Sequence, residues 1–314
     1  MPHLQLPLFR SFVQDSVWQV RHSALFSLPN ILSRLELEEK RQLALEVILS
    51  LAKDEQHTVR SGVLEALAEV MYTFADDEGG PPSELVRLFL GLRDGATKPD
   101  PFPPQEMYTT ATTSFSDYVA WAKENPIIAE PEKLDIYNDT TRPLVCAFNF
   151  PAVALTLGHD RWPELRSLYH DLSVYRSPKV QTTLAASLGE LAKIVGHQYA
   201  KEDLMDVWYG SVRAQESEVR QKAVQCLGMF VEHISEECRR DVFDAILNEL
   251  WDQKFRNWRE REGIMKHMPD FISTGVVQEE MLVKLFAKGL EDSTAAVREA
   301  AIALVSCEIL TGPI

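Results

Sequence analysis

The sequence has few cysteines, fewer basic than acidic side chains, and no long apolar run. Four cysteines in 314 residues, with no Cys-x-x-Cys pair, argue against a disulfide framework and against a zinc knuckle. The 32 Lys and Arg residues are outnumbered by 47 Asp and Glu, for a net charge of −15. Such a surface repels phosphate backbones and anionic lipids, so we expect no nucleic-acid partner. No stretch of about eighteen apolar residues occurs, so we expect no membrane-spanning segment and no membrane partner.

Targeting and catalytic motifs are also missing. The N-terminus has no basic start followed by an apolar stretch, so we expect no signal peptide and a location in the cytoplasm, with the nucleus as a second compartment. Gly-x-Ser-x-Gly, both glycine-rich nucleotide loops and His-Glu-x-x-His are absent. We therefore expect no enzyme activity, no catalytic residues, no cofactor and no small-molecule substrate.

A metal-dependent repeat enzyme is the weakest alternative. Deoxyhypusine hydroxylase, which is built from two-helix repeats, binds iron with His-Glu pairs at helix starts. The nearest matches here are His159-Asp160 and His170-Asp171. They do not occupy equivalent positions of the repeat, so we expect no metal site.

An apolar residue followed by Arg recurs along the chain. The clear copies are Val20-Arg21, Val59-Arg60, Val219-Arg220 and Val297-Arg298, and the weaker ones are Val180-Gln181 and Trp258-Arg259. The first two copies are 39 residues apart, and the copies at 180, 219, 258 and 297 also follow one another at steps of 39. A period near forty is typical of stacked two-helix units of the HEAT class.

Each unit is predicted to be a helix, a short turn and a second helix. After its Val, the second helix has apolar residues at steps of three and four, as at Val59, Val63, Leu67 and Val70. Asp15, Asp54 and Asp292 each precede that Val by five residues, in the turn, where Asp favours a helix start. No segment shows strand alternation. The sequence predicts an all-α solenoid of about seven antiparallel helix pairs.

The domain organisation follows from one interruption of the period. Residues 94–142 contain six prolines, no periodicity, and four Lys or Arg against nine Asp or Glu. We expect N-terminal repeats over 1–93, an acidic, largely disordered insert over 94–142, and C-terminal repeats over 143–314. Neither end resembles a capping repeat, which leaves open a longer array.

The recurring Arg has a structural and a functional interpretation. It can bind the turn Asp of a neighbouring unit and fix the stacking angle, which we expect to be its main role, or it can contact a partner directly. This repeat ladder is predicted to comprise Arg21, Arg60, Arg220, Arg259 and Arg298.

Two turns combine aromatic and basic residues in an otherwise acidic chain. They are residues 175–179, with Tyr175 and Arg176, and residues 254–259, with Lys254, Phe255 and Arg256. Aromatic and Arg side chains are frequent anchors of protein interfaces, although packing between units would explain them too.

Selected segments give a more specific resemblance. The segments CAFNFPAVALTLGHDRWPELRSLYHDL, KVQTTLAASLGELAKIVG and DLMDVWYGSV, with SEVRQKAVQCLGMFVEHI, resemble the regulatory subunit 1 family of protein phosphatase 4. The opening WQVRHSALFSLPNIL is similar to that family and to the scaffold subunit of phosphatase 2A. Gln181 departs from the family's usual Arg.

The resemblance implies a non-catalytic subunit that binds a type 2A-like phosphatase catalytic subunit and directs it to substrates. The metal ions of that reaction would belong to the catalytic chain. By position, the catalytic chain would contact the turns at 14–18, 53–58, 175–179, 214–218, 252–257 and 291–296. The candidate contact residues are Trp18, Tyr175, Arg176, Lys254, Phe255 and Arg256. The competing hypothesis is an importin-like HEAT adaptor for protein transport.

Overall fold

The computed structural model describes residues 5–103 and 135–311, in which helices are joined by turns and loops and no strand occurs. The predicted all-α fold is confirmed. The chain divides into two compact units, residues 1–175 and 176–314. Among the described helices, none combines the length and the apolar character needed to cross a membrane.

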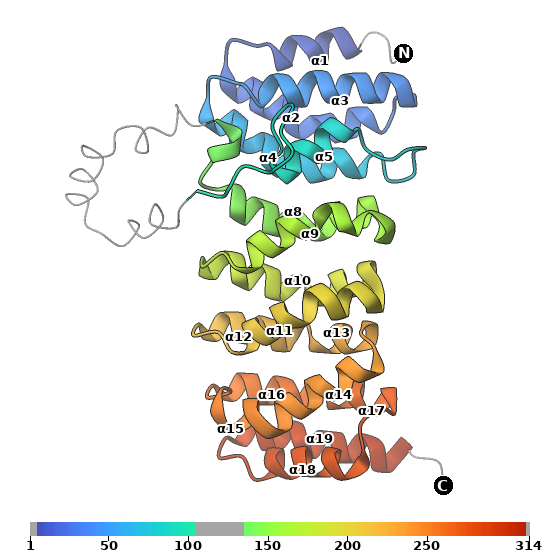
Figure 1. The fold of residues 1–314 in the computed structure, drawn as a ribbon, viewed down its shortest axis with the longest axis vertical. Helices are drawn as coiled ribbons and strands as arrows, with labels where there is room; N and C mark the ends of the chain where they lie inside the picture. The colour runs from blue at the N-terminus through green and yellow to red at the C-terminus, as the bar shows by residue number, and fades with distance from the viewer. Residues whose placement is uncertain (1–4, 104–134, 312–314) are drawn as a thin grey trace, which may run out of the picture. The chain divides into compact units, whose positions relative to one another are not determined.

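Unit 1 contains seven α-helices and two short 3₁₀ segments among its described residues (Figure 1). They are α1 (Gln5–Val13), α2 (Trp18–Leu32), α3 (Leu37–Leu51), α4 (His57–Tyr72), α5 (Ser83–Leu90), η5 (Ile136–Asn138), α8 (Arg142–Leu157), η6 (His159–Arg161) and α9 (Trp162–Ser173). Helices α2, α4 and α8, each the second of its pair, pack one on the next. The helices α1 and α3 precede them in sequence and pack beside them.

Unit 2 continues the same pattern with more interruptions. Its helices are α10 (Pro178–Tyr199), α11 (Met205–Val212), α12 (Ser217–Gln225), α13 (Leu227–His233), α14 (Glu236–Ala245), α15 (Trp251–Gln253), α16 (Trp258–Lys266), α17 (Met268–Thr274), α18 (Glu279–Leu290) and α19 (Ala295–Thr311), with π-helical turns η7 (Ala200–Leu204) and η8 (Ile246–Leu250). Helix α10 packs on α12 and α13, α12 packs on α16, and α16 packs on α19. The second helices at 217–233 and 258–274 are each broken in two.

Apolar spacing explains why these helices form and pack. In α4, Val59, Val63, Leu67 and Val70 follow the predicted three-and-four steps, and all four side chains are fully buried. A helix with this stripe is stable only when a neighbour covers the stripe, so each second helix requires the next one.

The predicted insert is ordered at both ends. Residues 94–103 and 135–142 are described, while the rest of the segment lies outside the described residues. Ser61 of α4 donates a hydrogen bond to Asp139, and Arg93 pairs with Asp100 and Asp135, each at 2.7 Å. Composition alone did not predict these contacts, because two of them join residues distant in sequence, Ser61 with Asp139 and Arg93 with Asp135.

One close approach requires a glycine. Gly91 ends α5 with a φ of 78°, and a Cβ at this position would lie 1.8 Å from Nη2 of Arg142. Arg142 is buried and its guanidinium lies 4.9 Å from the ring centroid of Phe102. A side chain at residue 91 would therefore displace the guanidinium of Arg142, which is the first residue of α8.

Candidate functional site: the turns before the second helices

The repeat ladder is a set of Arg side chains at the fourth residue of the second helices. They are Arg21 in α2, Arg60 in α4, Arg220 in α12, Arg261 in α16 and Arg298 in α19. Each donates from Nη1 to a backbone carbonyl of the preceding turn, six residues back, at 2.7 or 2.8 Å. The ladder therefore holds the turn backbone against the start of the helix.

The same Arg also binds the following unit where a carboxylate is available. Arg21 donates from Nε and Nη2 to Asp54 at 2.6 and 2.7 Å, and Arg261 donates to Asp292 at 2.5 and 3.1 Å. These bidentate pairs link adjacent turns.

Each of these carboxylates also orders its own turn. Asp54 accepts from the backbone N–H of Gln56 at 2.9 Å, and Asp292 accepts from that of Thr294 at 2.8 Å. Burial alone would raise the pKa of Asp54, but the hydrogen bonds from Arg21 and Gln56 lower it below its usual value. The pKa of Asp292 is lowered in the same way, against burial, by Arg261 and Thr294.

The predicted ladder was wrong at one position. Arg259 is exposed, and its guanidinium lies 4.4 Å from the ring centroid of Trp258, whereas Arg261 makes the ladder contacts. The 39-residue step places Trp258 at the position that Val occupies in the other units. The helix start lies two residues later than that alignment, since Asn257 and Glu260 form a capping box. The Asn-x-x-Glu spacing was the available signal.

The corrected register reveals an exchange of residue types. The third residue of the second helix is Val59, Val180, Val219 or Val297 in other units, all fully buried, but it is Glu260 in α16. The turn position of Asp54 and Asp292 holds Phe255 instead.

Glu260 performs the role of the missing turn Asp. Its side chain is fully buried and accepts from Nε of Arg220 at 2.9 Å and from Ser217 at 3.0 Å. Phe255 is 1% exposed and fills apolar space. The acidic and the apolar residue have thus exchanged positions. The Arg220–Glu260 ion pair still links α12 to the next unit.

The structure distributes the predicted contact residues between the surface and the core. Arg176 and Arg256 are exposed, and Trp18 and Lys254 are half-buried. The prediction that Phe255 offers its ring to a partner was wrong, because the side chain is packed inside unit 2.

Tyr175 is held within unit 1. Its ring meets Phe102 edge-on at a centroid distance of 5.7 Å, and its hydroxyl donates to the carbonyl of Pro103 at 3.1 Å. This contact fastens the start of the 94–142 segment to the end of α9. The side chain of Tyr175 is half-buried.

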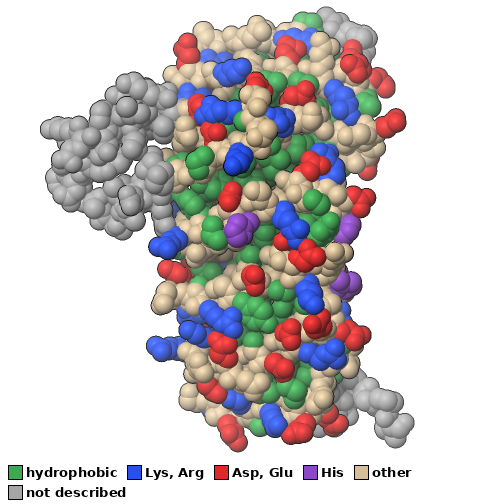
Figure 2. Space-filling view, in the orientation of Figure 1, with side chains coloured by type: hydrophobic (Ala, Val, Ile, Leu, Met, Phe, Trp, Pro, Cys, Tyr) green, Lys and Arg blue, Asp and Glu red, His purple; other side chains and the backbone are tan. Residues whose placement is uncertain are grey.

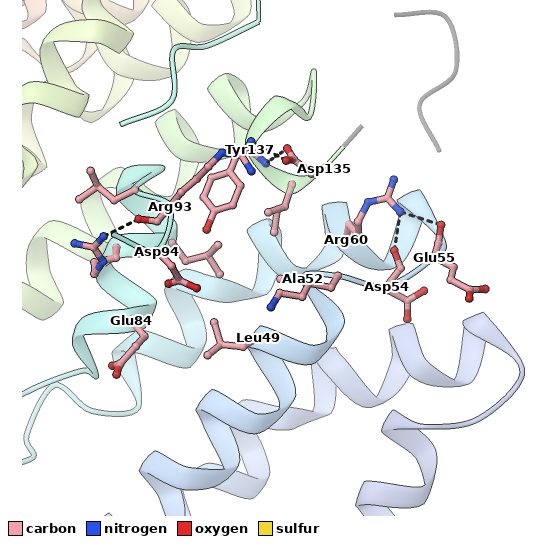
Figure 3. Close-up of a pocket in the computed structure, with 15 residues that line it drawn as sticks. Leu49, Ala52, Asp54, Glu55, Arg60, Glu84, Arg93, Asp94, Asp135 and Tyr137 are labelled. Atoms are coloured by element: carbon pink, nitrogen blue, oxygen red, sulfur yellow. Dashed lines mark hydrogen bonds and ion pairs between the residues drawn. The ribbon is translucent and has the colours of Figure 1, made fainter. Parts of the chain in front are cut away.

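A cleft of about 470 Å³ adjoins the 53–55 turn in unit 1. It lies between this turn, the end of α5 and η5 (Figure 3). Figure 3 shows Tyr137 beside Arg93 and Asp135, and the Arg93 guanidinium lies 4.5 Å from its ring centroid. Burial, with the negative charge of Asp94, raises the pKa of the Tyr137 hydroxyl.

Charged side chains make up much of the cleft lining. Its described lining has no serine, histidine or cysteine, but it includes Lys53, Asp94 and Tyr137. Arg60 and Arg87 donate to backbone carbonyls, which leaves Glu55, Glu84 and Asp94 as exposed acidic groups beside Lys53.

A serine, a histidine and an aspartate do meet elsewhere in unit 1, in a structural arrangement. The Ser61 hydroxyl donates to Asp139, and Nε2 of His57 lies 3.2 Å from the same carboxylate oxygen. Asp139 is 1% exposed and also accepts from the backbone N–H of Thr141 at 2.8 Å. Nε2 of His57 also lies 3.3 Å from Oγ of Ser61, so the three side chains form one hydrogen-bonded cluster. The cluster fixes the end of the 94–142 segment to α4.

The visible faces carry mixed charge. Figure 2 shows acidic and basic side chains interspersed over both units, with no continuous basic area on the side shown. Within the part of the chain that the structure describes, no three His, Cys, Asp or Glu side chains are grouped to hold a metal ion.

Comparison with known proteins agrees with the resemblance in the sequence. A family model of the protein phosphatase 4 regulatory subunit 1 middle domain matches residues 146–250. Serine/threonine-protein phosphatase 4 regulatory subunit 1 of Homo sapiens and that of Mus musculus are each 34% identical over 123 residues. The chain resembles this regulatory subunit over its central part. The matched segment is 39% of this chain and spans 13% of the length of each relative.

Proposed function

We propose that this chain is part of a non-catalytic regulatory subunit that binds the catalytic subunit of a type 2A-like serine/threonine phosphatase and directs it to substrates. The observation that carries the proposal is the match of residues 146–250 to the middle domain of protein phosphatase 4 regulatory subunit 1. The relatives are named as regulatory subunits, which supports a role without catalysis.

The turns before the second helices are the proposed contact surface. The ladder arginines hold the carbonyls of the turns before α2, α4, α12 and α16 in place, so side chains on these four turns are presented from a fixed backbone. Fixed backbone lowers the entropy lost on binding. The accessible candidates are Trp18, Tyr175, Arg176, Lys254 and Arg256.

Co-purification from cells followed by mass spectrometry tests the proposal. We expect a type 2A-like catalytic subunit to accompany the chain. Replacing Lys254 and Arg256 by Glu should weaken its binding at least tenfold, about 1.4 kcal/mol, with little change in the thermal midpoint. A matched Lys193→Glu, Arg240→Glu variant reverses two charges on exposed helix positions of the same unit and should bind normally. Absence of any such catalytic subunit would refute the proposal.

An importin-like transport adaptor is the second candidate, motivated by the net charge of −15. It would bind basic localisation peptides or a nuclear GTPase, and added salt would weaken the peptide binding. For either function we propose a location in the cytoplasm and the nucleus.

A further inference from the structure

Helix α8 exposes an apolar stripe that nothing in the described structure covers. Phe148 is 75% exposed and Leu155 is 58% exposed, and Ala152 between them is also exposed. The three positions follow steps of four and three, so they share one helix face. On the neighbouring helix α4, Tyr72 is 54% exposed. We call Phe148, Ala152, Leu155 and Tyr72 the α8 stripe.

The stripe is distinct from the core face of α8. Cys146, Phe150 and Val153 are buried, so the helix already covers one apolar face within unit 1. A second, solvent-exposed apolar face has no role in holding the unit together. Contiguous exposed apolar groups on a soluble protein commonly mark interaction sites.

Hydrogen bonds between α4 and α8 place acidic groups beside the stripe. Asn149 donates from Nδ2 to the carbonyls of Leu64 and Glu65 at 3.0 and 3.3 Å. Phe148 therefore lies at the level of Glu65. Leu155 follows Phe148 by seven residues, and Tyr72 follows Glu65 by seven residues, with Glu69 between them on the same face of α4.

These two glutamates give the stripe a charge preference. Glu65 and Glu69 are exposed, and neither carboxylate has an ion-pair partner among the described residues. A ligand that covers the stripe with apolar side chains would place its flank against these negative charges. Basic side chains on that flank are favoured and acidic ones are disfavoured.

We propose that the α8 stripe binds an amphipathic helix of a partner protein, with apolar residues at i, i+4 and i+7 and lysine or arginine on the flank that faces α4. An apolar helix face laid on an apolar surface is a common mode of peptide recognition, and an exposed aromatic ring such as Phe148 is a common anchor. The inference does not require that the chain binds a phosphatase, so the two can fail separately.

A synthetic peptide measures the interaction directly. The probe is a fluorescently labelled helical peptide with leucines on one face and lysines on both flanks, titrated with the full chain and followed by anisotropy. A peptide of the same composition in scrambled order and one with glutamate in place of lysine serve as comparison ligands. We expect the amphipathic basic peptide to bind at least tenfold more tightly than either.

Variants locate the binding. Phe148→Ser with Leu155→Ser should weaken binding at least tenfold without lowering the thermal midpoint, because both side chains are exposed. Leu8→Ser removes a 56% exposed leucine from α1 and should leave binding unchanged. Glu65→Gln with Glu69→Gln should weaken binding of the basic peptide several-fold more than Glu38→Gln with Glu299→Gln, which removes the same charge from α3 and α19.

Three outcomes would overturn the proposal. The first is equal binding by the Phe148, Leu155 double variant and the unaltered chain. The second is equal binding of the lysine and glutamate peptides. The third is a dimer of the chain in sedimentation that the double variant dissociates, because the stripe would then be covered by a second copy.

Discussion

At the scale of single residues, Arg261 and Arg259 make a matched pair. Arg261 holds Asp292 and the carbonyl of Phe255, and its side chain is 13% exposed, while Arg259 is exposed over Trp258. We expect Arg261→Ala to lower the free energy of unfolding by about 2–3 kcal/mol, because it leaves a largely buried carboxylate without its partner. Arg259→Ala should cost about 0.5–1 kcal/mol. Urea unfolding of both variants measures the difference. Equal losses of unfolding free energy would mean that Arg259 contributes as much to the repeat ladder as Arg261.

The exchange of Phe255 and Glu260 predicts coupling between two substitutions. Glu260→Val alone removes the partner of Arg220, and Phe255→Asp alone removes a buried ring. Together they recreate the arrangement around Asp54 and Asp292, with the acid in the turn. We expect the double variant to be more stable than the sum of the single losses by at least about 1 kcal/mol. Strict additivity in a double-mutant cycle of unfolding free energies would show that the two positions do not share Arg220.

At the scale of the turn and its helix, the ladder makes stability depend on pH. Asp54 and Asp292 have lowered pKa values in the folded state. A carboxyl group of this kind stabilises the fold above its unfolded pKa, near 4, and the contribution is lost as the pH falls through the folded value. We therefore expect the urea midpoint to fall steeply below about pH 4.

Single amides separate this contribution from the total charge. Asp54→Asn should be less stable than the parent chain at pH 7 and should lose less on acidification. Asp171→Asn, at an exposed position of α9, controls for the loss of one negative charge. If both variants follow the parent curve, the turn carboxylates do not set the acid limit.

The helices were predictable from sequence because their signals are local. Apolar spacing in α4 and the turn aspartates Asp54 and Asp292 gave the helix pairs and their starts. The breaks at Cys226 and His267 and the π-helical turns η7 and η8 were not predicted, since the apolar pattern continues across them. The Glu260 site was missed for a related reason. A fixed step of 39 assumes equal spacing of the units, but α16 begins two residues later than that step predicts.

At the scale of the whole molecule, the sequence did not predict which of the turn side chains lie on the surface. It singled out aromatic and basic turns, but Phe255 is packed in the core and Tyr175 is fastened to Pro103. Phe148 was noted only as part of a resemblance, and its exposure depends on how α4 and α8 pack. Single-sequence patterns identify apolar residues. They do not tell which of two apolar faces a neighbouring helix covers.

Because the Arg–Asp ion pairs join only adjacent turns, we expect the loss of one pair to destabilise only the neighbouring helices. Arg261 connects the turns before α16 and α19, and Arg21 connects those before α2 and α4. In a stacked array, stability is approximately a sum of unit terms and neighbour terms, so a lost link should loosen only the helices it joins. We expect Arg261→Ala to speed amide hydrogen exchange in α16, α18 and α19, with α2–α4 unchanged, and Arg21→Ala to give the converse. Mass spectrometry of peptic fragments resolves these segments. Uniform acceleration by either substitution would mean that the chain unfolds as one cooperative block, in which case the ladder stabilises all helices together.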